Sequence, residues 1–268
     1  MQMANKSILF EGFNAVRSAI CGIEIGVSHR EVQTVFFAES RLKKKGYEFS
    51  WLQTKAKSLS FSLQILPDAE LAQMCSSSTS GGIAGLFSER AYGTLDQLDK
   101  ASLRRGGSVW YLAAEGIEDP YNLGYIIRSA YVFGCSAVLL PDRFIFGSDN
   151  ILCRSSAGAS ERLPIFRLDL PVAVRRLRES GFSVYAATEK NALPIEDASF
   201  PLPLCIAIGG EKRGLSSALL AECDERVVIG YARNVSSSLS AVSAADILAY
   251  EIARKNKSVI KRERYENF

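Results

Sequence analysis

Residues 204–215, LCIAIGGEKRGL, contain the pattern that indicates the fold of most of this chain. A continuous apolar run ends at two glycines, Gly209 and Gly210, and polar residues and a helix-like segment follow it. Strands that are apolar on both faces are typical of parallel sheets that helices cover on both sides. Two glycines at the end of such a strand let the backbone come close to a ligand. The stretch therefore predicts a buried parallel strand with a binding loop at its end.

Similar apolar runs recur through the sequence after residue 108, with helix-like segments between them. They are VWYLAA from Val109, AVLLP from Ala137, LPIFRL from Leu163, SVYAAT from Ser183 and RVVIGY from Arg226. This alternation predicts an α/β fold with a mostly parallel sheet. Ligands of such sheets bind outside the carboxyl ends of the strands, so we expect the functional residues in the loops that follow these runs.

The first part of the chain has a different pattern. Short β-like runs, VQTVFFA and SFSLQIL, alternate with polar helical stretches, which predicts a small α/β unit. Residues 91–107, AYGTLDQLDKASLRRGG, are polar and end in a glycine pair, which predicts a linker with one short helix. We therefore expect a small α/β domain over residues 1–95, a linker over 96–107 and a second domain over 108–268.

The composition is that of a folded protein and restricts its chemistry. The 268 residues are 47% apolar and 23% charged, and they are enough for two domains. His29 is the only histidine, which argues against zinc sites and Ser-His-Asp or Cys-His catalysis. The six cysteines lie at least eighteen residues apart, so we predict reduced thiols and no metal site. Neither a G-x-S-x-G elbow nor a dinucleotide fingerprint is present, which argues against a hydrolase or a reductase.

The apolar runs and the charged residues indicate the cellular location of the protein and its binding partners. No apolar run approaches the roughly 18 residues of a membrane-spanning helix, and the first residues lack a signal-peptide pattern, so we expect a cytoplasmic protein with no membrane partner. Residues 41–57, RLKKKGYEFSWLQTKAK, combine six basic residues with three aromatic ones. This mixture suits contacts with RNA phosphates and unpaired bases, although a solvated helix with its aromatic residues in the core would look the same.

Three loops after predicted strands contain residues suited to chemistry. The first, IEDPYNLGYIIRSAYVFG over residues 117–134, contains Asn122 near a helix start and Arg128 on an otherwise apolar segment. Helix capping and a salt bridge would also explain these two residues. The second loop is the glycine loop described above, which presents Glu211. The third, ARNVSSSLSAVSAADILAYEIARK, has a serine cluster in which Ser238 is a good N-cap for the helix that follows.

In this order and at these separations, the three loops resemble the motifs of the SpoU (TrmH-like) branch of the SPOUT methyltransferases. The first motif, Asn-x-Gly-x-x-x-Arg-x-Ala-x-x-Phe-Gly, is matched by Asn122, Gly124, Arg128, Ala130, Phe133 and Gly134. The second, Gly-x-Glu-x-x-Gly-Leu, is matched by Gly209, Glu211, Gly214 and Leu215. The third, Ile-Pro-Met then Ser-Leu-Asn-Val-Ser-x-Ala, is matched in part by Ile229, Ser238, Leu239, Ser243 and Ala244. Two departures stand out, because Gly230-Tyr231 replaces the Pro-Met pair and Ser240 replaces the asparagine.

The resemblance covers about Val109 to Lys255 and implies a fold and an assembly. It implies the SPOUT fold, an α/β sheet whose C-terminal part forms a deep trefoil knot. The first domain looks like the ribosomal-protein-like, RNA substrate-binding extension of the family, with FEGFNAVRSAI similar to its opening signature. The family works as a homodimer. We expect the dimer interface at a small-residue face of the last helix, formed by Ala241, Ala244, Ala245 and Leu248.

The resemblance also implies a reaction and its site residues. The reaction is transfer of a methyl group from S-adenosylmethionine to a ribose 2′-hydroxyl of tRNA or rRNA. By position, the cofactor would be bound by Thr188, Gly209, Gly210, Ile229, Ser238 and Leu239, mostly through backbone groups. Arg128 would be the catalytic cation that stabilises the developing alkoxide. Asn122 and Glu211 would orient Arg128 and the substrate, and Ser238 would help to fix the site.

Ser240 leaves a second hypothesis open. Serine keeps a hydroxyl but is shorter than asparagine and lacks the amide. The chain could be an enzyme in which a water bridges the gap, or a non-catalytic RNA-binding or scaffold protein with the same fold. The motifs do not distinguish tRNA from rRNA, nor do they identify the nucleotide.

Overall fold

The structure of the chain is a computed structural model that divides into two compact units. It describes residues 7–76, 80–104, 108–142, 149–233 and 238–257. The first unit comprises Met1–Ala91 and Gly147–Arg162, and the second comprises Tyr92–Phe146 and Leu163–Phe268. The chain therefore passes from one unit to the other three times.

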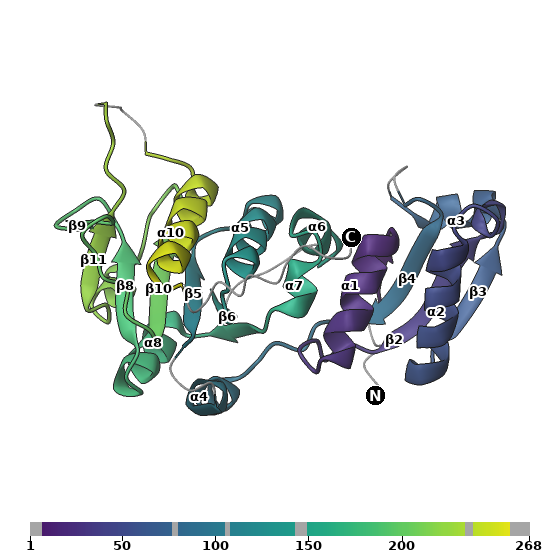
Figure 1. Cartoon of the computed structure of the whole chain (residues 1–268), viewed down its shortest axis with the longest axis horizontal. Helices are drawn as coiled ribbons and strands as arrows, with labels where there is room; N and C mark the ends of the chain where they lie inside the picture. The colour runs from purple at the N-terminus through teal and green to yellow at the C-terminus, as the bar shows by residue number, and fades with distance from the viewer. Residues whose placement is uncertain (1–6, 77–79, 105–107, 143–148, 234–237, 258–268) are drawn as a thin grey trace. The chain divides into compact units, whose positions relative to one another are not determined.

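The first unit contains a four-stranded mixed sheet with helices packed on it (Figure 1). Its strands, in the spatial order β1-β4-β2-β3, are β1 (Ser7–Glu11), β4 (Ile83–Ser88), β2 (Val32–Ala38) and β3 (Ser62–Leu66). Its helices are α1 (Phe13–Glu24), the short 3-10 helix η1 (Glu39–Arg41), α2 (Gly46–Leu59), α3 (Asp68–Met74), α6 (Asp149–Ser155) and α7 (Ala159–Arg162). Strand β4 is antiparallel to β1 and β2, whereas β2 and β3 are parallel. Phe10, Ile20, Phe37 and Leu52 are fully buried in its core.

Helices α6 and α7 belong to the first unit although they follow β6 of the second unit in the sequence. Helix α7 packs so closely on α1 that a Cβ atom at Gly22 would clash with the carbonyl oxygen of Glu161. Cys153 of α6 is fully buried in the core of the first unit. This grouping differs from the expected division at residues 96–107, because residues 149–162 bury their side chains against α1 and β1.

Four charged side chains link residues 149–162 to the rest of the first unit. The Arg30 Nε donates to Glu161 Oε2 at 3.0 Å, and its Nη2 donates to Asp149 Oδ2 at 2.6 Å. The Arg90 guanidinium donates to the other oxygen of Glu161. The Arg30 and Glu161 side chains have no exposed surface. Burial alone would lower the pKa of Arg30, but the two carboxylates more than offset it and raise the pKa above its ordinary value.

The second unit is built on a seven-stranded sheet in which every strand pair is parallel. Its strands, in the spatial order β7-β6-β5-β10-β8-β11-β9, are β7 (Ile165–Leu168), β6 (Ala137–Pro141), β5 (Trp110–Glu115), β10 (Leu204–Gly209), β8 (Ser183–Ala187), β11 (Glu225–Val228) and β9 (Leu193–Pro194). The predicted α/β fold with a mostly parallel sheet is confirmed. Strands β5 and β10 are central, and their register places Gly209 opposite Glu115.

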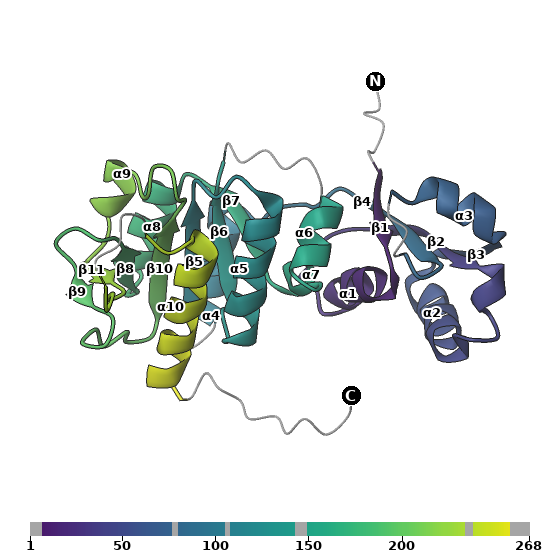
Figure 2. The same cartoon turned by 90° about the horizontal axis from the view of Figure 1, so that it is seen from above.

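Helices cover both faces of this sheet. They are α4 (Leu95–Arg104), α5 (Pro120–Val132), α8 (Leu170–Glu179), α9 (Ser217–Leu220) and α10 (Ala241–Lys255). Helices α5 and α10 lie side by side on one face, and α4 and α8 lie on the other (Figures 1 and 2). Along β5, Tyr111 and Ala113 pack toward α8, whereas Trp110 and Leu112 face α5 and α10. Both faces are buried, which explains why the strands read as continuous apolar runs.

The expected linker and the expected dimer face both contribute to this core. Helix α4 begins at Leu95, one residue before the expected linker of residues 96–107, and its Leu98 is fully buried among the residues of the α8 face. On α10, Ala245, Leu248 and Ala249 surround a narrow space with β5 and β10. The assignment of the small-residue face to a dimer interface is therefore wrong, because Ala241, Ala245 and Leu248 are buried within their own chain.

The six cysteines are unpaired thiols. Burial raises the pKa of the Cys223 thiol to about 12 and raises the pKa values of Cys153 and Cys205 as well. These three thiols are therefore not suited to thiolate chemistry at neutral pH.

Candidate functional site

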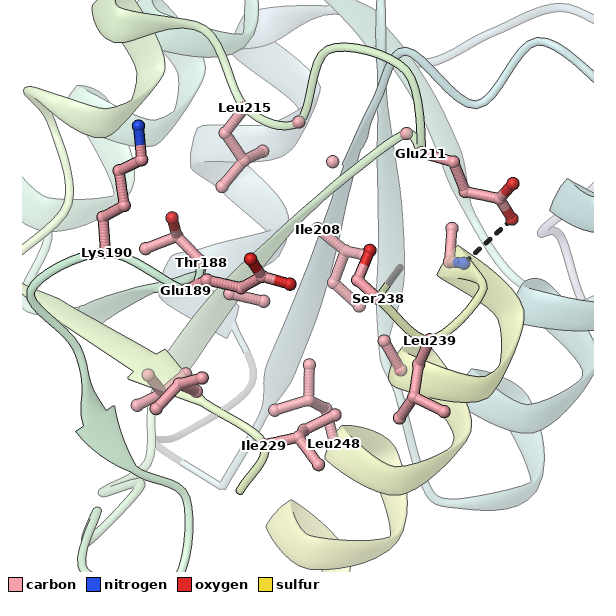
Figure 3. A pocket seen from close by; sticks show the side chains of 18 of the residues that line it. Thr188, Glu189, Lys190, Ile208, Glu211, Leu215, Ile229, Ser238, Leu239 and Leu248 are labelled. Carbon is pink, nitrogen blue, oxygen red and sulfur yellow. Dashed lines mark hydrogen bonds between the residues drawn. The ribbon is translucent and has the colours of Figure 1, made fainter. Parts of the chain in front are cut away.

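A cavity of about 470 Å³, the first cavity, lies at the carboxyl ends of β8, β10 and β11, beside the start of α10 (Figure 3). Parallel strands bring the loops that follow them to one edge of the sheet, which is where the sequence analysis expected function. All six residues expected to bind a cofactor line this cavity: Thr188, Gly209, Gly210, Ile229, Ser238 and Leu239. Their cofactor-binding role itself remains a prediction.

The two glycines at the end of β10 are required by packing within the chain. A Cβ atom at Gly209 would clash with the backbone of Gly214, and one at Gly210 would clash with the carbonyl oxygen of Gly116. The loop also closes on itself, since the Gly214 N–H donates to the Gly210 carbonyl at 2.8 Å. The two glycines were expected to let the backbone approach a ligand, whereas the structure shows that they let other backbone segments approach closely.

Glu115, at the end of β5, holds the far end of this loop. Its carboxylate accepts hydrogen bonds from the Ser216 N–H at 2.6 Å and from the Ser216 hydroxyl at 2.9 Å. The Ser216 hydroxyl in turn accepts from the Leu219 N–H and caps α9. The motifs do not include Glu115, and the only sign of it in the sequence is a carboxylate at the end of an otherwise apolar strand.

Glu211 connects the loop to α10. Its Oε1 accepts a hydrogen bond from the backbone N–H of Ala241 at 3.2 Å (Figure 3). Ala241 is the first residue of α10, and a carboxylate at a helix N-terminus is favoured by the free N–H groups and the helix dipole. Glu211 therefore fixes the position of α10 relative to the glycine loop.

The N-cap of α10 is Ser240, the residue that replaces the asparagine of the third motif. Its hydroxyl accepts from the Ser243 N–H at 3.1 Å and donates to the Ser243 hydroxyl at 3.0 Å. The prediction that Ser238 caps this helix is wrong, because α10 begins at Ala241 and Ser238 lies two residues before its cap. Ser238 lines the first cavity instead, whereas Ser240 is not among the residues that line it.

A second cavity of about 360 Å³ adjoins the first. It is lined by Gly116, Ile117, Glu118, Asp119, Asn122, Gly210, Glu211, Lys212 and Ala241. Gly210, Glu211 and Ala241 line both cavities and form the wall between them. Asn122 is not the cap of α5, because Asp119 accepts hydrogen bonds from the N–H groups of Tyr121 and Asn122 at 2.7 and 3.1 Å. Capping therefore does not explain Asn122.

Arg128 is separated from the other expected catalytic residues. It is exposed on α5 and lines neither cavity. It follows Asn122 by six residues, which turns it about 120° around the helix axis. Within the described part of the chain it has no ion pair, so the salt-bridge explanation does not hold. The structure therefore brings Asn122, Glu211 and Ser238 to the cavities but leaves Arg128 outside them.

Tyr231, one of the two residues that replace the Pro-Met pair, also belongs to the first cavity. Its hydroxyl accepts a hydrogen bond from the Leu239 N–H at 3.0 Å. This bond joins the segment that follows β11 to the segment that precedes α10. In sequence Tyr231 is only a departure from the motif, and its hydrogen bond with the Leu239 N–H could not be predicted.

The chain resembles known proteins in sequence. The sequence model of the SpoU rRNA Methylase family matches residues 110–250. A Staphylococcus haemolyticus protein, named as a candidate TrmH family tRNA/rRNA methyltransferase, is 28% identical over 255 residues, which are 95% of this chain and 98% of that protein.

Two solved structures share the fold. An AdoMet-bound rRNA methyltransferase from Sinorhizobium meliloti has a TM-score of 0.75 at 20% identity and covers 92% of this chain and 87% of its own. An RNA 2′-O ribose methyltransferase has a TM-score of 0.71 at 23% identity and covers 95% of this chain and 90% of its own. No described helix is both long and apolar enough to cross a membrane. Since the family match spans more than half of the chain, the chain belongs to the SpoU rRNA Methylase family, a family of RNA methyltransferases.

Proposed function

We propose that this chain transfers the methyl group of S-adenosylmethionine to a ribose 2′-hydroxyl of tRNA or rRNA. The observation that carries the proposal is the pair of adjoining cavities. The first is lined by every residue expected to bind the cofactor, and the second is lined by Asn122 and Glu211. The two cavities share Gly210, Glu211 and Ala241, so a donor in the first and an acceptor in the second would be neighbours.

The residues of the first cavity fit S-adenosylmethionine. Ile208, Ile229, Leu239 and Leu248 supply apolar surface for an adenine ring, and Thr188 and Ser238 supply hydroxyls (Figure 3). The volume lies in the range of roughly 300 to 1,000 Å³ typical of small-molecule sites. When bound, the cofactor supplies an electrophilic methyl group on a positively charged sulfur.

The second cavity is the proposed place of the ribose. Methyl transfer requires an in-line approach of the 2′-oxygen and stabilisation of the charge that develops on it. The amide of Asn122 can hydrogen-bond the ribose, and Glu211 keeps the wall between the cavities in place through Ala241. Arg128 supplies the cation, since its planar guanidinium can contact a phosphate and the reacting hydroxyl together.

A homodimer accounts for the position of Arg128. Helix α5 has an exposed stripe, here called the α5 stripe, formed by Tyr121, Tyr125, Arg128 and Val132. Tyr121 is 51% exposed, Tyr125 is 45% exposed and Val132 is 68% exposed. Exposed apolar surface of this kind marks an interaction site, and a second copy is the simplest partner. We place Arg128 at the second cavity of the partner subunit.

The first unit is the proposed RNA-binding domain, and the sheet of the second unit is proposed to carry the trefoil knot. Lys43, Lys44 and Tyr47 are exposed around the start of α2, whereas Lys45 pairs with Glu48 at 2.9 Å. Two of the three aromatic residues in this stretch pack on the core, as Phe13 with Trp51 and Phe37 with Phe49 form edge contacts. The RNA contacts are therefore expected from the lysines and Tyr47.

Mass-spectrometric mapping of ribose methylation in total RNA tests the proposal. Cells that lack the protein should lose a 2′-O-methyl mark at a defined nucleotide, and purified protein should restore it with labelled S-adenosylmethionine. An unchanged methylation map, together with RNA binding but no methyl transfer by the purified protein, would support the non-catalytic scaffold hypothesis that Ser240 raises.

A further inference from the structure

Glu189 is a carboxylate in the first cavity whose role the motifs do not explain. It follows β8, lines the cavity and is exposed. Figure 3 shows its carboxylate pointing into the cavity, between Thr188 and Ser238 in that view. Within the described part of the chain it has no ion pair or hydrogen-bond partner. A carboxylate that faces a cavity and makes no contact with a donor of its own protein can accept hydrogen bonds from a ligand there.

The proposed cofactor offers four groups that a carboxylate can bind. These are the positively charged sulfur, the ammonium group of the amino-acid end, the amino group of the adenine and the two neighbouring hydroxyls of the ribose. Only the hydroxyls present two donors on adjacent carbon atoms. An ionised carboxylate only accepts hydrogen bonds, and its two oxygens match two adjacent hydroxyl donors. Acidic residues that follow a strand of a parallel sheet bind nucleotide ribose in this way in dinucleotide-binding folds.

The reaction itself argues against the sulfur. Methyl transfer removes the positive charge from that atom. A carboxylate beside it would stabilise the bound reactant more than the transition state, and the reaction would be slower. The ribose hydroxyls keep the same charge throughout the reaction, so binding them carries no such penalty.

The amino-acid end has other candidates for its charges. Lys190 and Arg213 line the same cavity and can attract the cofactor carboxylate, and Glu211 can attract the ammonium group. We therefore propose that Glu189 binds the ribose hydroxyls of S-adenosylmethionine, an inference that rests on the proposed cofactor of this site.

Isothermal calorimetry with a set of cofactor analogues tests this role without any activity assay. The variant is Glu189→Gln, which keeps the shape and removes the charge, and the control is Glu196→Gln, an exposed carboxylate that lines neither cavity. We expect Glu189→Gln to bind S-adenosylmethionine, S-adenosylhomocysteine and 5′-methylthioadenosine about tenfold more weakly, by the same factor for all three, because a charge-assisted hydrogen bond is lost. Glu196→Gln should bind all three as the wild type does.

An analogue of S-adenosylhomocysteine without ribose hydroxyls completes the test. It should bind to wild type and Glu189→Gln with equal, weakened affinity. A loss confined to S-adenosylmethionine would assign Glu189 to the sulfur, and unchanged binding of 5′-methylthioadenosine would assign it to the amino-acid end. Either result would overturn the inference and leave the proposed function intact.

Two further measurements separate this inference from folding and from the proposed function. Circular dichroism of Glu189→Gln should match the wild type, and Glu189→Asp, which keeps the charge on a shorter side chain, should bind S-adenosylhomocysteine with intermediate affinity. If Glu189→Asp bound S-adenosylhomocysteine no more tightly than Glu189→Gln does, a charged acceptor at this position would be contradicted. A wild-type protein that binds none of these ligands would overturn the proposed cofactor and this inference together.

Discussion

Two groups of charged residues in this protein show opposite arrangements. In the first unit, Arg30, Arg90 and Glu161 are buried and paired with one another. At the first cavity of the second unit, Glu189 and Lys190 face accessible space without a partner among the described residues. Buried charges must be paired to be tolerated, so the role of the first group is structural. Unpartnered charges at a cavity remain available to a ligand, and they indicate function more reliably than the total charge of +3 does.

The largest effect is expected from breaking the buried group. Glu161→Gln removes the charge that Arg30 and Arg90 share, and losing one partner of a buried ion pair typically costs about 3 to 5 kcal/mol of the free energy of unfolding. Denaturant unfolding followed by fluorescence measures this loss. Glu222 is a matched control, because it also pairs with two arginines, Arg175 and Arg178, but these lie at the surface.

Glu222→Gln should destabilise the protein less, since Arg175 and Arg178 are solvent-exposed and remain hydrated when Glu222 loses its charge. Cofactor affinity should be unchanged in Glu161→Gln, because the first cavity lies wholly in the second unit. Equal destabilisation by the two variants would contradict the contrast between buried and surface pairs.

The next largest effect concerns Arg128. Arg128→Lys keeps the charge but loses the planar fork, so it should retain cofactor and RNA binding and lose about 10² to 10³ in methylation rate. A tritiated-methyl assay measures the rate. Arg176→Lys is the control, because Arg176 is an exposed arginine of α8 on the other face of the sheet. An unchanged rate in Arg128→Lys would remove Arg128 from the chemistry.

Much of the second unit could be predicted from sequence, because its signals are local. Continuous apolar strands determined the parallel sheet, and the loops after such strands must meet at one edge. This explains why residues as far apart as Thr188 and Leu239 line one cavity. The family motifs then selected the individual residues within those loops.

The parts that could not be predicted depend on contacts between distant segments. No periodicity reveals that residues 149–162 pack on α1, since that packing depends on a missing side chain at Gly22 and on Glu161 meeting Arg30. The sequence of helix α4 resembles a linker because it is mostly polar, and among the residues whose burial is described only Leu98 is fully buried. The motif spacing contains the angle between Asn122 and Arg128 on the helix, but it does not contain which side of α5 faces the cavities.

The α5 stripe lies at the surface of the second unit, and a substitution in it tests the proposed dimer. Val132→Glu places a charge on the stripe at an exposed position, so it should turn the proposed dimer into a monomer while cofactor affinity is kept. Light scattering at tens of micromolar measures the mass. Val172→Glu, an exposed valine of α8, should leave the mass unchanged. A monomeric wild-type protein would refute the dimer.

A smaller effect is expected at Tyr231. Tyr231→Phe removes the acceptor of the Leu239 N–H and should weaken cofactor binding about threefold to tenfold, in line with about 1 kcal/mol for one hydrogen bond. Calorimetry with S-adenosylhomocysteine measures the affinity, and Tyr47→Phe, an exposed tyrosine of the first unit, is the control. Tighter binding would mean that the hydroxyl competes with the cofactor for this N–H.

The smallest effect is expected from restoring the motif at Ser240. Asparagine caps helices as well as serine does, so Ser240→Asn should leave the free energy of unfolding and the cofactor affinity unchanged, because the Ser240 hydroxyl serves α10 and does not line the first cavity. Ser240→Ala, which loses the hydrogen bond from the Ser243 N–H, should cost about 1 kcal/mol. With stability and binding matched in this way, the methylation rate of Ser240→Asn isolates the effect of the amide on chemistry. A rate equal to or above the wild-type rate is expected of an enzyme whose serine is tolerated. A variant that gains activity from an inactive wild type would instead identify Ser240 as the substitution that silenced the site.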